Sequence, residues 1–477
     1  MKNTFVYYAM VGVLTLTLSF CNVLFASNNQ PKKKVSVFPC VFSHSTTLLE
    51  ADSITVNFTI DNEQVQKAKH VLWDFGDGKQ SSEMNPSHKF ARGKNYEVSL
   101  TWNVINTVTE TVKLSNVKVR FEDLGETIIC NQDIPLKDSL GALYYNFRTW
   151  PYYYHIAFPD VCRMKDGRLI CVWRRGMQHM QPGMGRLELA IGSPDGTKWG
   201  KSWIFAAEDS LDLRDPSIFM CPNGDLLCNY FISYDGHTWV QRSTDNGQTW
   251  SERFAINSLE GSAYTSSRPA VINNEVWLAT YGTAGSDNEN SLISILKSKD
   301  NGQTWTQEVP FSKLNPETYK FQEPALVQSG NRVICHVRVD EGGMHDYVRG
   351  IGEMRQIVSD DCGKTWSDWR EDFDFCGQAH ELYKTESGVL ISAFRWLSPD
   401  IKSTYVGMMY STDNGDTWSK DRIIRISPSD SECGYPSIVS LGDDKFLVTY
   451  YKYMRAGRLL HKMQIASRIY QVHVTCE

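Results

Sequence analysis

The chain has 477 residues, of which 41% are hydrophobic and 12% aromatic, so it is long enough to bury a large core and to form a second, smaller domain. Its mild acidity, a formal net charge of -6, and the lack of a basic stripe argue against nucleic acid as a partner. After the first 26 residues, no segment is apolar enough to span a bilayer.

Residues 1–26 have the pattern of an export signal. Lys2 supplies the positive start, a long apolar run follows, and Leu24-Phe-Ala26 is a candidate cleavage site. Leu18-Ser-Phe-Cys21 resembles a bacterial lipobox, so a second interpretation is a lipoprotein signal that ends before Cys21 and attaches the chain to a membrane. An uncleaved anchor is a third. We expect an exported bacterial protein, in the periplasm, at the cell surface or secreted.

The twelve Cys residues include no Cys-x-x-Cys pair, which argues against a zinc site. Cys171, Cys228 and Cys335 lie in apolar strand patterns, where Cys behaves as a small hydrophobe, so we expect them in the core. Export permits disulfides among others, such as Cys40 and Cys130, but the sequence does not pair them. We expect neither a catalytic metal nor an organic cofactor, and a structural Ca²⁺ at the acidic loops stays open.

Residues 35–120 alternate apolar and polar side chains without helical periodicity, which predicts a small β-sandwich. Their order of motifs resembles the PKD domain, an immunoglobulin-like module common on secreted carbohydrate-active enzymes. The resemblance implies a spacer or a weak glycan-binding arm, and we interpret Asp74 and Asp77 as turn formers, not catalytic acids. The motifs are Trp73-Asp-Phe-Gly-Asp-Gly78, Asn85-Pro-Ser-His-Lys-Phe90 and Gly93-Lys-Asn-Tyr-Glu-Val-Ser-Leu100.

Residues 121–150 are predicted to be a linker with one hydrophobic strand, Thr127-Ile-Ile-Cys130. Over residues 151–477, a short motif then recurs with Ser, Asp, Gly, Thr and Trp at fixed places. In each copy Asp bonds nearby backbone N–H groups, Gly takes a positive φ and Trp packs under the loop, as in a hairpin turn. The copies are Ser243-Thr-Asp-Asn-Gly-Gln-Thr-Trp250, Ser298-Lys-Asp-Asn-Gly-Gln-Thr-Trp305, Ser359-Asp-Asp-Cys-Gly-Lys-Thr-Trp366, Ser411-Thr-Asp-Asn-Gly-Asp-Thr-Trp418 and a degenerate Ser193-Pro-Asp-Gly-Thr-Lys-Trp199.

Each copy marks one strand-turn-strand unit that is too small to bury its own core, which predicts a propeller. The motif resembles the Asp-box, or BNR repeat, of the sialidase superfamily. This resemblance implies an all-β chain, with an N-terminal immunoglobulin-like (PKD) sandwich followed by a six-bladed sialidase-like β-propeller. Asp-boxes lie on the outside of propellers, in enzymes and in binding proteins alike, so they predict architecture and not reaction.

A second repeated element is an X-Pro step followed by a turn and an apolar strand, and its six occurrences predict six blades. A last strand near Gln464 to Cys476 is expected to close the ring. The residue before proline is pushed to extended geometry, and in such a propeller it faces the central funnel. We call these the slot residues. Because they differ from blade to blade, they favour a functional site over a structural role. They are Phe158, Asp215, Arg268, Glu323, His380 (before Glu381, not proline) and Tyr435.

A second set of cations lies roughly fourteen residues beyond the slot. Several cations at one pocket clamp a carboxylate, sulfate or phosphate by bidentate hydrogen bonds. The alternatives are scattered surface cations and simple ion pairs, such as Asp215 with Arg214 or Arg268 and Glu323 with Arg338. The cations are Arg174, Arg175, Arg338, Arg395 and Lys452.

The sialidase resemblance implies roles for some of these residues. Sialidases hold the substrate carboxylate with three Arg, attack with a Tyr assisted by Glu, and use an Asp as acid and base. Tyr435 matches the nucleophile, and Glu323 with Arg338 matches the Glu and the Arg that follows it. Arg395 is a candidate third Arg. Sialidases carry the first Arg in Phe/Tyr-Arg-Ile-Pro, where this chain has Ala157, and the stretch 174–180 lacks the expected Asp.

His155, His380 and Tyr435 beside several Arg favour a different reaction, elimination from a uronic acid. A base removes the C5 proton, cations stabilise the enolate-like intermediate, and the departing C4 oxygen takes a proton. Propeller-fold polysaccharide lyases, including those acting on ulvan, resemble this in using His, Tyr and Arg. For His155, a hydrogen-bonded lining role is the alternative.

We therefore expect a monomeric enzyme that acts on acidic oligosaccharides or polysaccharides as a lyase or dehydratase, giving an unsaturated uronate. The alternatives are an exo-α-sialidase and a glycan-binding propeller without catalysis. The candidate catalytic residues are His380, Tyr435, Glu323, His155 and Asp215, and the candidate carboxylate-binding residues are Arg268, Arg338, Arg395 and Arg174.

Overall fold

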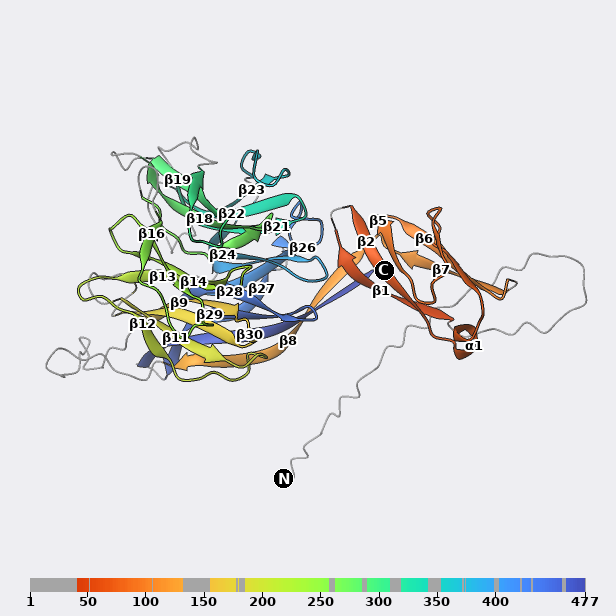
Figure 1. The fold of residues 1–477 in the computed structure, drawn as a ribbon, viewed down its shortest axis with the longest axis horizontal. Helices are drawn as coiled ribbons and strands as arrows, with labels where there is room; N and C mark the ends of the chain where they lie inside the picture. Colours follow the sequence, from red (N-terminus) through yellow and green to blue (C-terminus); the bar gives the residue numbers. More distant parts are fainter. Residues whose placement is uncertain are drawn as a thin grey trace, which may run out of the picture. The chain divides into compact units, whose positions relative to one another are not determined.

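A computed structural model describes residues 41–131 and 155–476, apart from 51, 105, 177–178, 180–184, 257–261, 285–289, 309–318, 342–352, 371–372, 374, 399–402, 421–422, 430–431 and 457–459. The predicted export signal, Cys21, Cys40 and residues 132–150 of the predicted linker lie outside the described residues. The described chain is almost entirely strand, with one short helix (Figure 1), and it contains no helix long and apolar enough to cross a membrane. It divides into two compact units, one containing Asp52–Lys118 and the other Val119–Val474.

The first unit is a sandwich of two sheets, β1-β2-β5 and β4-β3-β6-β7. The predicted alternation is confirmed in β2, where Ile54, Val56 and Phe58 are buried. The core is aromatic, with the Trp73 ring 4.9 Å from that of Phe42 and 5.3 Å from that of Phe58. The elements are β1 (Phe42–Leu49), β2 (Ser53–Ile60), α1 (Glu63–Gln66), β3 (Val71–Asp74), β4 (Gln80–Ser81), β5 (Ser87–Ala91), β6 (Asn95–Trp102) and β7 (Asn106–Lys113).

Asp74 and Asp77 shape the turn after β3, as predicted. Asp74 Oδ1 accepts a hydrogen bond from the Gly76 N–H at 2.9 Å, and Asp77 Oδ1 accepts one from the Lys79 N–H at 3.1 Å. Asp77 Oδ2 also lies 2.8 Å from His88 Nε2. The hydrogen bond from Gly76 lowers the pKa of Asp74, so the carboxylate stays ionised as a turn acceptor.

The second unit contains six antiparallel sheets, the blades, each beginning with its innermost strand. Blades 1 to 3 are β9 (His155–Arg163), β10 (Leu169–Gly176), β11 (Arg186–Gly192) and β12 (Trp203–Ala206); β13 (Leu213–Met220), β14 (Leu226–Ile232), β15 (Thr238–Ser243) and β16 (Phe254–Ile256); and β17 (Ala270–Ile272), β18 (Glu275–Ala284), β19 (Asn290–Ser298) and β20 (Thr306–Glu308). Blades 4 and 5 are β21 (Tyr319–Ser329), β22 (Arg332–Glu341) and β23 (Glu353–Ser359); and β24 (Cys376–Lys384), β25 (Leu390–Ser398), β26 (Ser403–Ser411) and β27 (Ile424–Ser429). Blade 6 is β28 (Cys433–Gly442), β29 (Lys445–Ala456), β30 (Leu460–Cys476) and β8 (Val117–Asn131).

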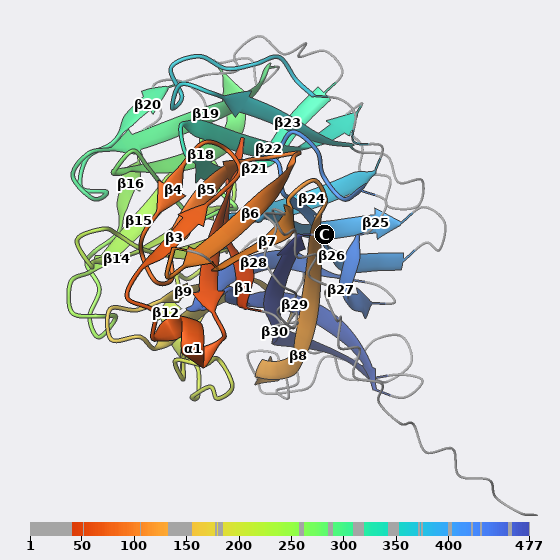
Figure 2. The same ribbon diagram turned by 90° about the vertical axis from the view of Figure 1, so that its right-hand side faces the viewer.

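Strand β8 closes the ring, which differs from the prediction that the C-terminal strand does so. Strand β30 is the third strand of blade 6, and β8, from the N-terminal side, pairs with it as the fourth. The strand predicted at Thr127–Cys130 is present as the end of the longer β8. Figure 2 shows β8 beside β30. Lys452, a predicted site cation, instead lies 2.6 Å from Glu126 of β8. The ammonium group of Lys452 therefore forms an ion pair within blade 6, between β29 and the ring-closing strand β8.

Apolar side chains fill the spaces between neighbouring blades. Cys171, Cys228 and Cys335 are fully buried there, which confirms their predicted place in the core. Burial raises the pKa of each of these thiols, because an apolar environment disfavours the thiolate. They pack as small hydrophobes.

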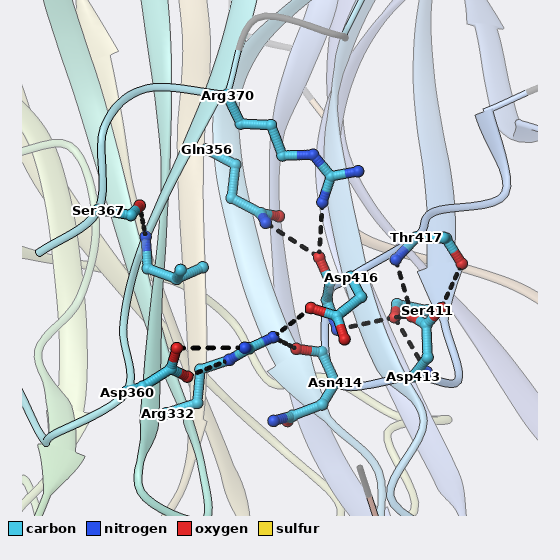
Figure 3. Close-up of polar contacts among 12 residues, drawn as sticks. Arg332, Gln356, Asp360, Ser367, Arg370, Ser411, Asp413, Asn414, Asp416 and Thr417 are labelled. Carbon is cyan, nitrogen blue, oxygen red and sulfur yellow. Dashed lines mark hydrogen bonds and ion pairs between the residues drawn. The ribbon is translucent and has the colours of Figure 1, made fainter. Parts of the chain in front are cut away.

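The Asp-boxes have the predicted turn geometry, shown for blade 5 in Figure 3. Asp413 Oδ1 accepts a hydrogen bond from the Thr417 N–H at 2.8 Å, and Ser411 Oγ accepts one from the Gly415 N–H at 2.9 Å. Gly415 has a φ of 84° and Trp418 is buried. The equivalent Asp-to-Thr bonds recur at Asp245, Asp300 and Asp361.

Arg332 of blade 4 joins this Asp-box to its neighbour. Its Nε lies 2.6 Å from Asp360 Oδ1, and its Nη1 lies 2.5 Å from Asp416 Oδ1 and donates to the Asn414 carbonyl at 3.1 Å (Figure 3). Gln356 Nε2 donates to the Gly415 carbonyl at 2.9 Å. The loop is thus held both by its own Asp413 and by blade 4.

Two aspartates of one loop test which of these contacts matters for stability. We expect Asp413→Ala to lower the free energy of unfolding by about 1–3 kcal/mol, because it leaves backbone N–H groups without their charged acceptor. Asp416→Ala removes only an exposed ion pair and should cost less than about 1 kcal/mol. Chemical denaturation of both variants measures the difference, and an equal or larger loss in Asp416→Ala would contradict the role given to Asp413.

Candidate active site

Five innermost strands carry the same backbone bulge among the described blades. In each, two residues face a single residue of the next strand. The first of the two has a left-handed φ that side-chain-bearing residues rarely adopt. The repetition brings these side chains to one level around the axis. The residues and φ values are Phe158 (58°), Asp215 (44°), Glu323 (52°), Ala379 (49°) and Tyr435 (49°).

The bulges correct the predicted slot position in blade 5. Ala379 holds the left-handed position in β24, and His380 takes the place that proline has in the other bulges. The prediction was wrong by one residue because blade 5 has no proline to mark the bulge. His380 is buried with its ring 6.1 Å from that of Phe394, and burial lowers its pKa to about 3. Its imidazole is neutral.

Arg268 also lies outside the slot level. Its guanidinium bonds Glu381 and donates to the Val161 carbonyl at 2.8 Å, and Nη1 lies 4.0 Å from Asp160. Asp160 and Glu381 follow the bulges in their strands, so Arg268 belongs to a second polar layer. Burial raises the pKa of Glu381 to about 7, opposed by the charge of Arg268. Its guanidinium is thus occupied by protein partners, but Arg268 also lines the cavity of Asp215 and Tyr435, so its role in carboxylate binding stays a prediction.

Tyr435, Glu323 and Arg338 meet at the slot, as the sequence predicted. The Tyr435 hydroxyl donates to Glu323 Oε1 at 2.5 Å, and Arg338 Nη1 lies 3.1 Å from the same oxygen. The Ala379 N–H donates to Glu323 Oε2 at 2.7 Å. Both carboxylate oxygens of Glu323 are thus held by neighbouring groups, and Oε1 accepts the hydrogen bond from the Tyr435 hydroxyl.

The charges around this pair fix its protonation. Burial alone would raise the pKa of Glu323, but the Arg338 and Arg395 guanidinium groups and the Tyr435 hydroxyl hold that pKa at about 2. Burial, together with the nearby carboxylates Glu323 and Asp215, raises the pKa of Tyr435 well above its usual value. At neutral pH the site therefore holds a neutral phenol bonded to an ionised carboxylate.

Arg395 covers one face of the nucleophile candidate. Its Cζ lies 5.3 Å from the Tyr435 ring centroid, and its Nε donates to Gln378 Oε1 at 3.0 Å. Gly434 permits this approach, because a Cβ at that position would lie 2.9 Å from Arg395 Cδ. Arg338 and Arg395 are thus the two predicted carboxylate-binding residues that lie beside Tyr435.

Asp215 and Arg214 form the opposite side of the site. Arg214 Nη2 lies 3.8 Å from Asp215 Oδ1, and its Cζ lies 5.5 Å from the Phe158 ring centroid. Burial raises the pKa of Asp215 to about 6, opposed by the charge of Arg214 and reinforced by that of Glu323. Asp215, Phe158 and Tyr435 line one cavity of about 20 Å³, which has room for about one water molecule. The slot residues therefore form a floor across the propeller axis.

Arg174 and Arg175 are held in buried ion pairs. Arg174 Nε donates to Asp212 Oδ1 at 2.8 Å, and Arg174 is fully buried. Arg175 bonds both oxygens of Glu188, at 2.5 and 2.7 Å. These contacts fit the alternative interpretation of the two cations as structural ion pairs.

His155 lies beside the slot but in a separate cluster. His155 Nε2 lies 3.3 Å from Glu432 Oε1, and His179 Nδ1 lies 2.5 Å from the same oxygen. Tyr451 Oη donates to it at 3.1 Å. The Phe158 ring separates the cluster from the slot, 5.1 Å from the His179 ring and 4.6 Å from the Tyr435 ring.

The sequence analysis missed His179, Glu432 and Tyr451, and it gave Arg214 only as a partner of Asp215. Arg214 had a usable signal, because it precedes the slot residue Asp215 as Ala157 precedes Phe158. His179, Glu432 and Tyr451 had none, since His179 and Glu432 are 253 positions apart and belong to no repeated motif.

Comparison with known proteins supports both units. A PKD domain family model matches residues 40–119, and a BNR repeat-like domain family model matches residues 224–450. No curated protein sequence matches the chain significantly.

Solved structures share the fold at low sequence identity. A Dyadobacter fermentans protein of unknown function is 19% identical with a TM-score of 0.57, covering 74% of this chain and 99% of its own. The Hadza microbial sialidase Hz136 is 13% identical with a TM-score of 0.50, covering 90% and 94%. The intramolecular trans-sialidase from Ruminococcus gnavus is 11% identical with a TM-score of 0.49, covering 66% and 94%. The chain therefore combines a PKD domain with a BNR repeat-like β-propeller of the sialidase-superfamily fold.

Proposed function

We propose that the chain is a carbohydrate-active enzyme that cleaves the glycosidic bond of a carboxylate-bearing sugar, with Tyr435 as nucleophile and Glu323 as its base. The observation that carries this proposal is the 2.5 Å hydrogen bond from the Tyr435 hydroxyl to Glu323 Oε1. Nucleophile and base within hydrogen-bond reach, with the base held by Arg338, is the arrangement that covalent catalysis needs.

The protonation states suit attack on an anionic substrate. A phenolate would be repelled by the substrate carboxylate, whereas the Tyr435 hydroxyl attacks as a neutral group. As its oxygen bonds to the anomeric carbon, its proton passes to Glu323, and the bond from that carbon to the leaving oxygen breaks. Asp215, with a pKa of about 6, is the candidate acid that protonates the leaving oxygen. Water then cleaves the tyrosyl intermediate with the proton transfers reversed.

Arg338, Arg395 and Arg214 are the proposed clamp for the substrate carboxylate. Arg338 and Arg395 are buried and lie beside Tyr435, and Arg214 stands across the Phe158 ring from it. Guanidinium groups bind carboxylates by paired, charge-assisted hydrogen bonds. Arg214 supplies from blade 2 the cation that blade 1 lacks at Ala157. The fold shared with the sialidase Hz136 is consistent with this substrate class.

Elimination from a uronate, the reaction that the sequence analysis favoured over hydrolysis, is the second candidate. It is favoured by Ala157 and by the contact between His179 and Glu432, which orients the imidazole, although burial lowers the pKa of His179 despite the opposing charge of Glu432. His380 is a poor base here, since it is buried and its pKa is about 3. Ulvan fragments and other uronate-ended oligosaccharides are its substrates under this proposal, and residues 1–26 would export the enzyme to them.

Product analysis separates the two reactions. We expect a sialylated trisaccharide to release free sialic acid, and Tyr435→Phe and Glu323→Gln each to lose about 10²- to 10⁴-fold in kcat, because nucleophile and base are removed with little change in shape. Mass spectrometry and ultraviolet absorbance follow the products. Formation of an unsaturated uronate from uronate-ended oligosaccharides would show that the reaction is elimination and not hydrolysis. Binding of either substrate without a product would indicate a glycan-binding role.

The pKa of Asp215 predicts a pH limit. We expect kcat/KM to fall above about pH 6, as Asp215 loses the proton that it must donate. The groups whose charge acts on it are Arg214, Glu323, Arg174 and Asp212, and the neutral phenols of Tyr281 and Tyr435 also lie near it. Asp215→Asn should remove this basic limb and act best on substrates with aryl leaving groups, which need no acid. A basic limb that persists in Asp215→Asn would assign the acid to another residue.

Arg214 is tested by its effect on both binding and proton transfer. We expect Arg214→Ala to raise KM by about 10- to 100-fold, because it removes a charged partner of the substrate carboxylate. It should also move the basic limb to higher pH, since a cation that lowers the pKa of Asp215 is lost. Arg253→Ala, which removes an ion pair with Glu208 and a contact with the Trp239 ring in blade 2, is the control and should change neither.

A further inference from the structure

Two histidines and a glutamate converge beside the active-site floor, apart from the Tyr435, Glu323 and Asp215 machinery proposed for hydrolysis. His155 Nε2, His179 Nδ1 and a Glu432 carboxylate oxygen all lie within 4.8 Å of one another. The three residues come from the start of β9, from the segment after β10 and from the residue before β28. Blades 1 and 6 therefore deliver three metal-type ligand atoms to one point.

The separations are close to those of a metal site. Tetrahedral zinc with bonds of about 2.1 Å places its ligand atoms roughly 3.4 Å apart. His155 Nε2 and Glu432 Oε1 are 3.3 Å apart, while His179 Nδ1 is 2.5 Å from the same oxygen and would move outward by about 1 Å to admit an ion. Residue 179 lies in the segment that joins β10 to β11, where such a shift disturbs no strand pairing.

Glu432 Oε1 already receives an unusual number of contacts. His155, His179 and the Tyr451 hydroxyl all lie within 3.3 Å of this single oxygen. A dication between the imidazoles would replace two of these hydrogen bonds by metal bonds and leave Tyr451 bonded to the carboxylate, as groups around metal ligands usually are. His155 and Glu432 are thus already oriented for coordination.

We propose that His155, His179 and Glu432 bind a divalent transition-metal ion of the zinc class. Two imidazole nitrogens and one carboxylate suit zinc and its neighbours, whereas Ca²⁺ and Mg²⁺ require oxygen ligands. Three protein ligands leave a coordination position for water or for an oxygen of a bound sugar, as in catalytic zinc sites. The sequence argument against zinc rested on missing Cys pairs, and this cluster uses no Cys.

The position of the cluster connects the ion to the substrate site. The Phe158 ring lies 5.9 Å from the His155 ring and 4.6 Å from the Tyr435 ring. The proposed ion would therefore lie on the other side of the Phe158 ring from Tyr435. Arg395, the cation whose charge acts on His179, competes with the ion and limits its affinity. The proposal does not depend on which reaction Tyr435 performs.

Metal titration of the full chain tests the site. After dialysis against chelator, we expect calorimetry to show one equivalent of Zn²⁺ bound, and Co²⁺ to give the visible absorption of a low-symmetry nitrogen and oxygen site. His179→Ala and Glu432→Gln should each weaken Zn²⁺ binding by more than about 100-fold, because loss of a ligand costs more than loss of a residue that only supports one. Ca²⁺ should not compete.

A matched control excludes adventitious binding. His473 and Glu122 form another His–Glu pair, with Nε2 and Oε2 2.8 Å apart, and among the described residues no third metal-type ligand joins them. We therefore expect His473→Ala to bind Zn²⁺ with the affinity and stoichiometry of the wild type. Thermal unfolding without metal verifies that each variant is folded. Failure of the wild type to bind Zn²⁺ or Co²⁺, or unchanged binding in folded His179→Ala and Glu432→Gln, overturns the proposal.

Discussion

The site depends on a strained backbone position repeated around the propeller axis. A left-handed conformation at a residue with a side chain costs of order 1–3 kcal/mol, and five innermost strands of the described blades adopt one. On both sides of each bulge the strand pairs regularly with its neighbour. The hydrogen bonds of these flanking pairs hold the strained residue in place. Without it, Glu323 and Tyr435 would not present their side chains to each other from different blades.

Burial then turns these side chains into a tuned electrostatic unit. Glu323 is ionised because two guanidinium groups outweigh the cost of removing its charge from water, whereas Asp215, with a single close cation and a neighbouring carboxylate, titrates near pH 6. Two carboxyl groups of one site are thus held in different protonation states by their surroundings, as acid and base assignments require. Each of these blades thus contributes a slot residue with a different charge state.

The fold was predictable because its signals are local. Each Asp-box is an eight-residue turn whose Ser, Asp, Gly and Thr bond one another, so the sequence alone marked the blades. A proline after the slot residue placed Phe158, Asp215, Glu323 and Tyr435 correctly. His380 was misplaced because blade 5 has no such proline, and Arg268 because the step before Pro269 does not have the bulge conformation. Ring closure by β8 and the cluster of His179 with Glu432 join segments hundreds of residues apart, and no periodicity reports such pairings.

Ala157 stands where sialidases carry their first arginine, and the cations around it are arranged to fit an alanine at this position. Ala157 pairs directly with Arg174 across the β9–β10 ladder, so an arginine at 157 would stand beside a buried guanidinium. Arg174 is held by Asp212, and a Cβ at Gly185 would collide with that carboxylate. The neighbouring blade then provides Arg214 from the position equivalent to 157. Blade 1 and blade 2 thus place Arg174 and Arg214 on the side of the site opposite Arg338 and Arg395, and under the proposed function Arg214 would take the place of the missing arginine in binding a substrate carboxylate.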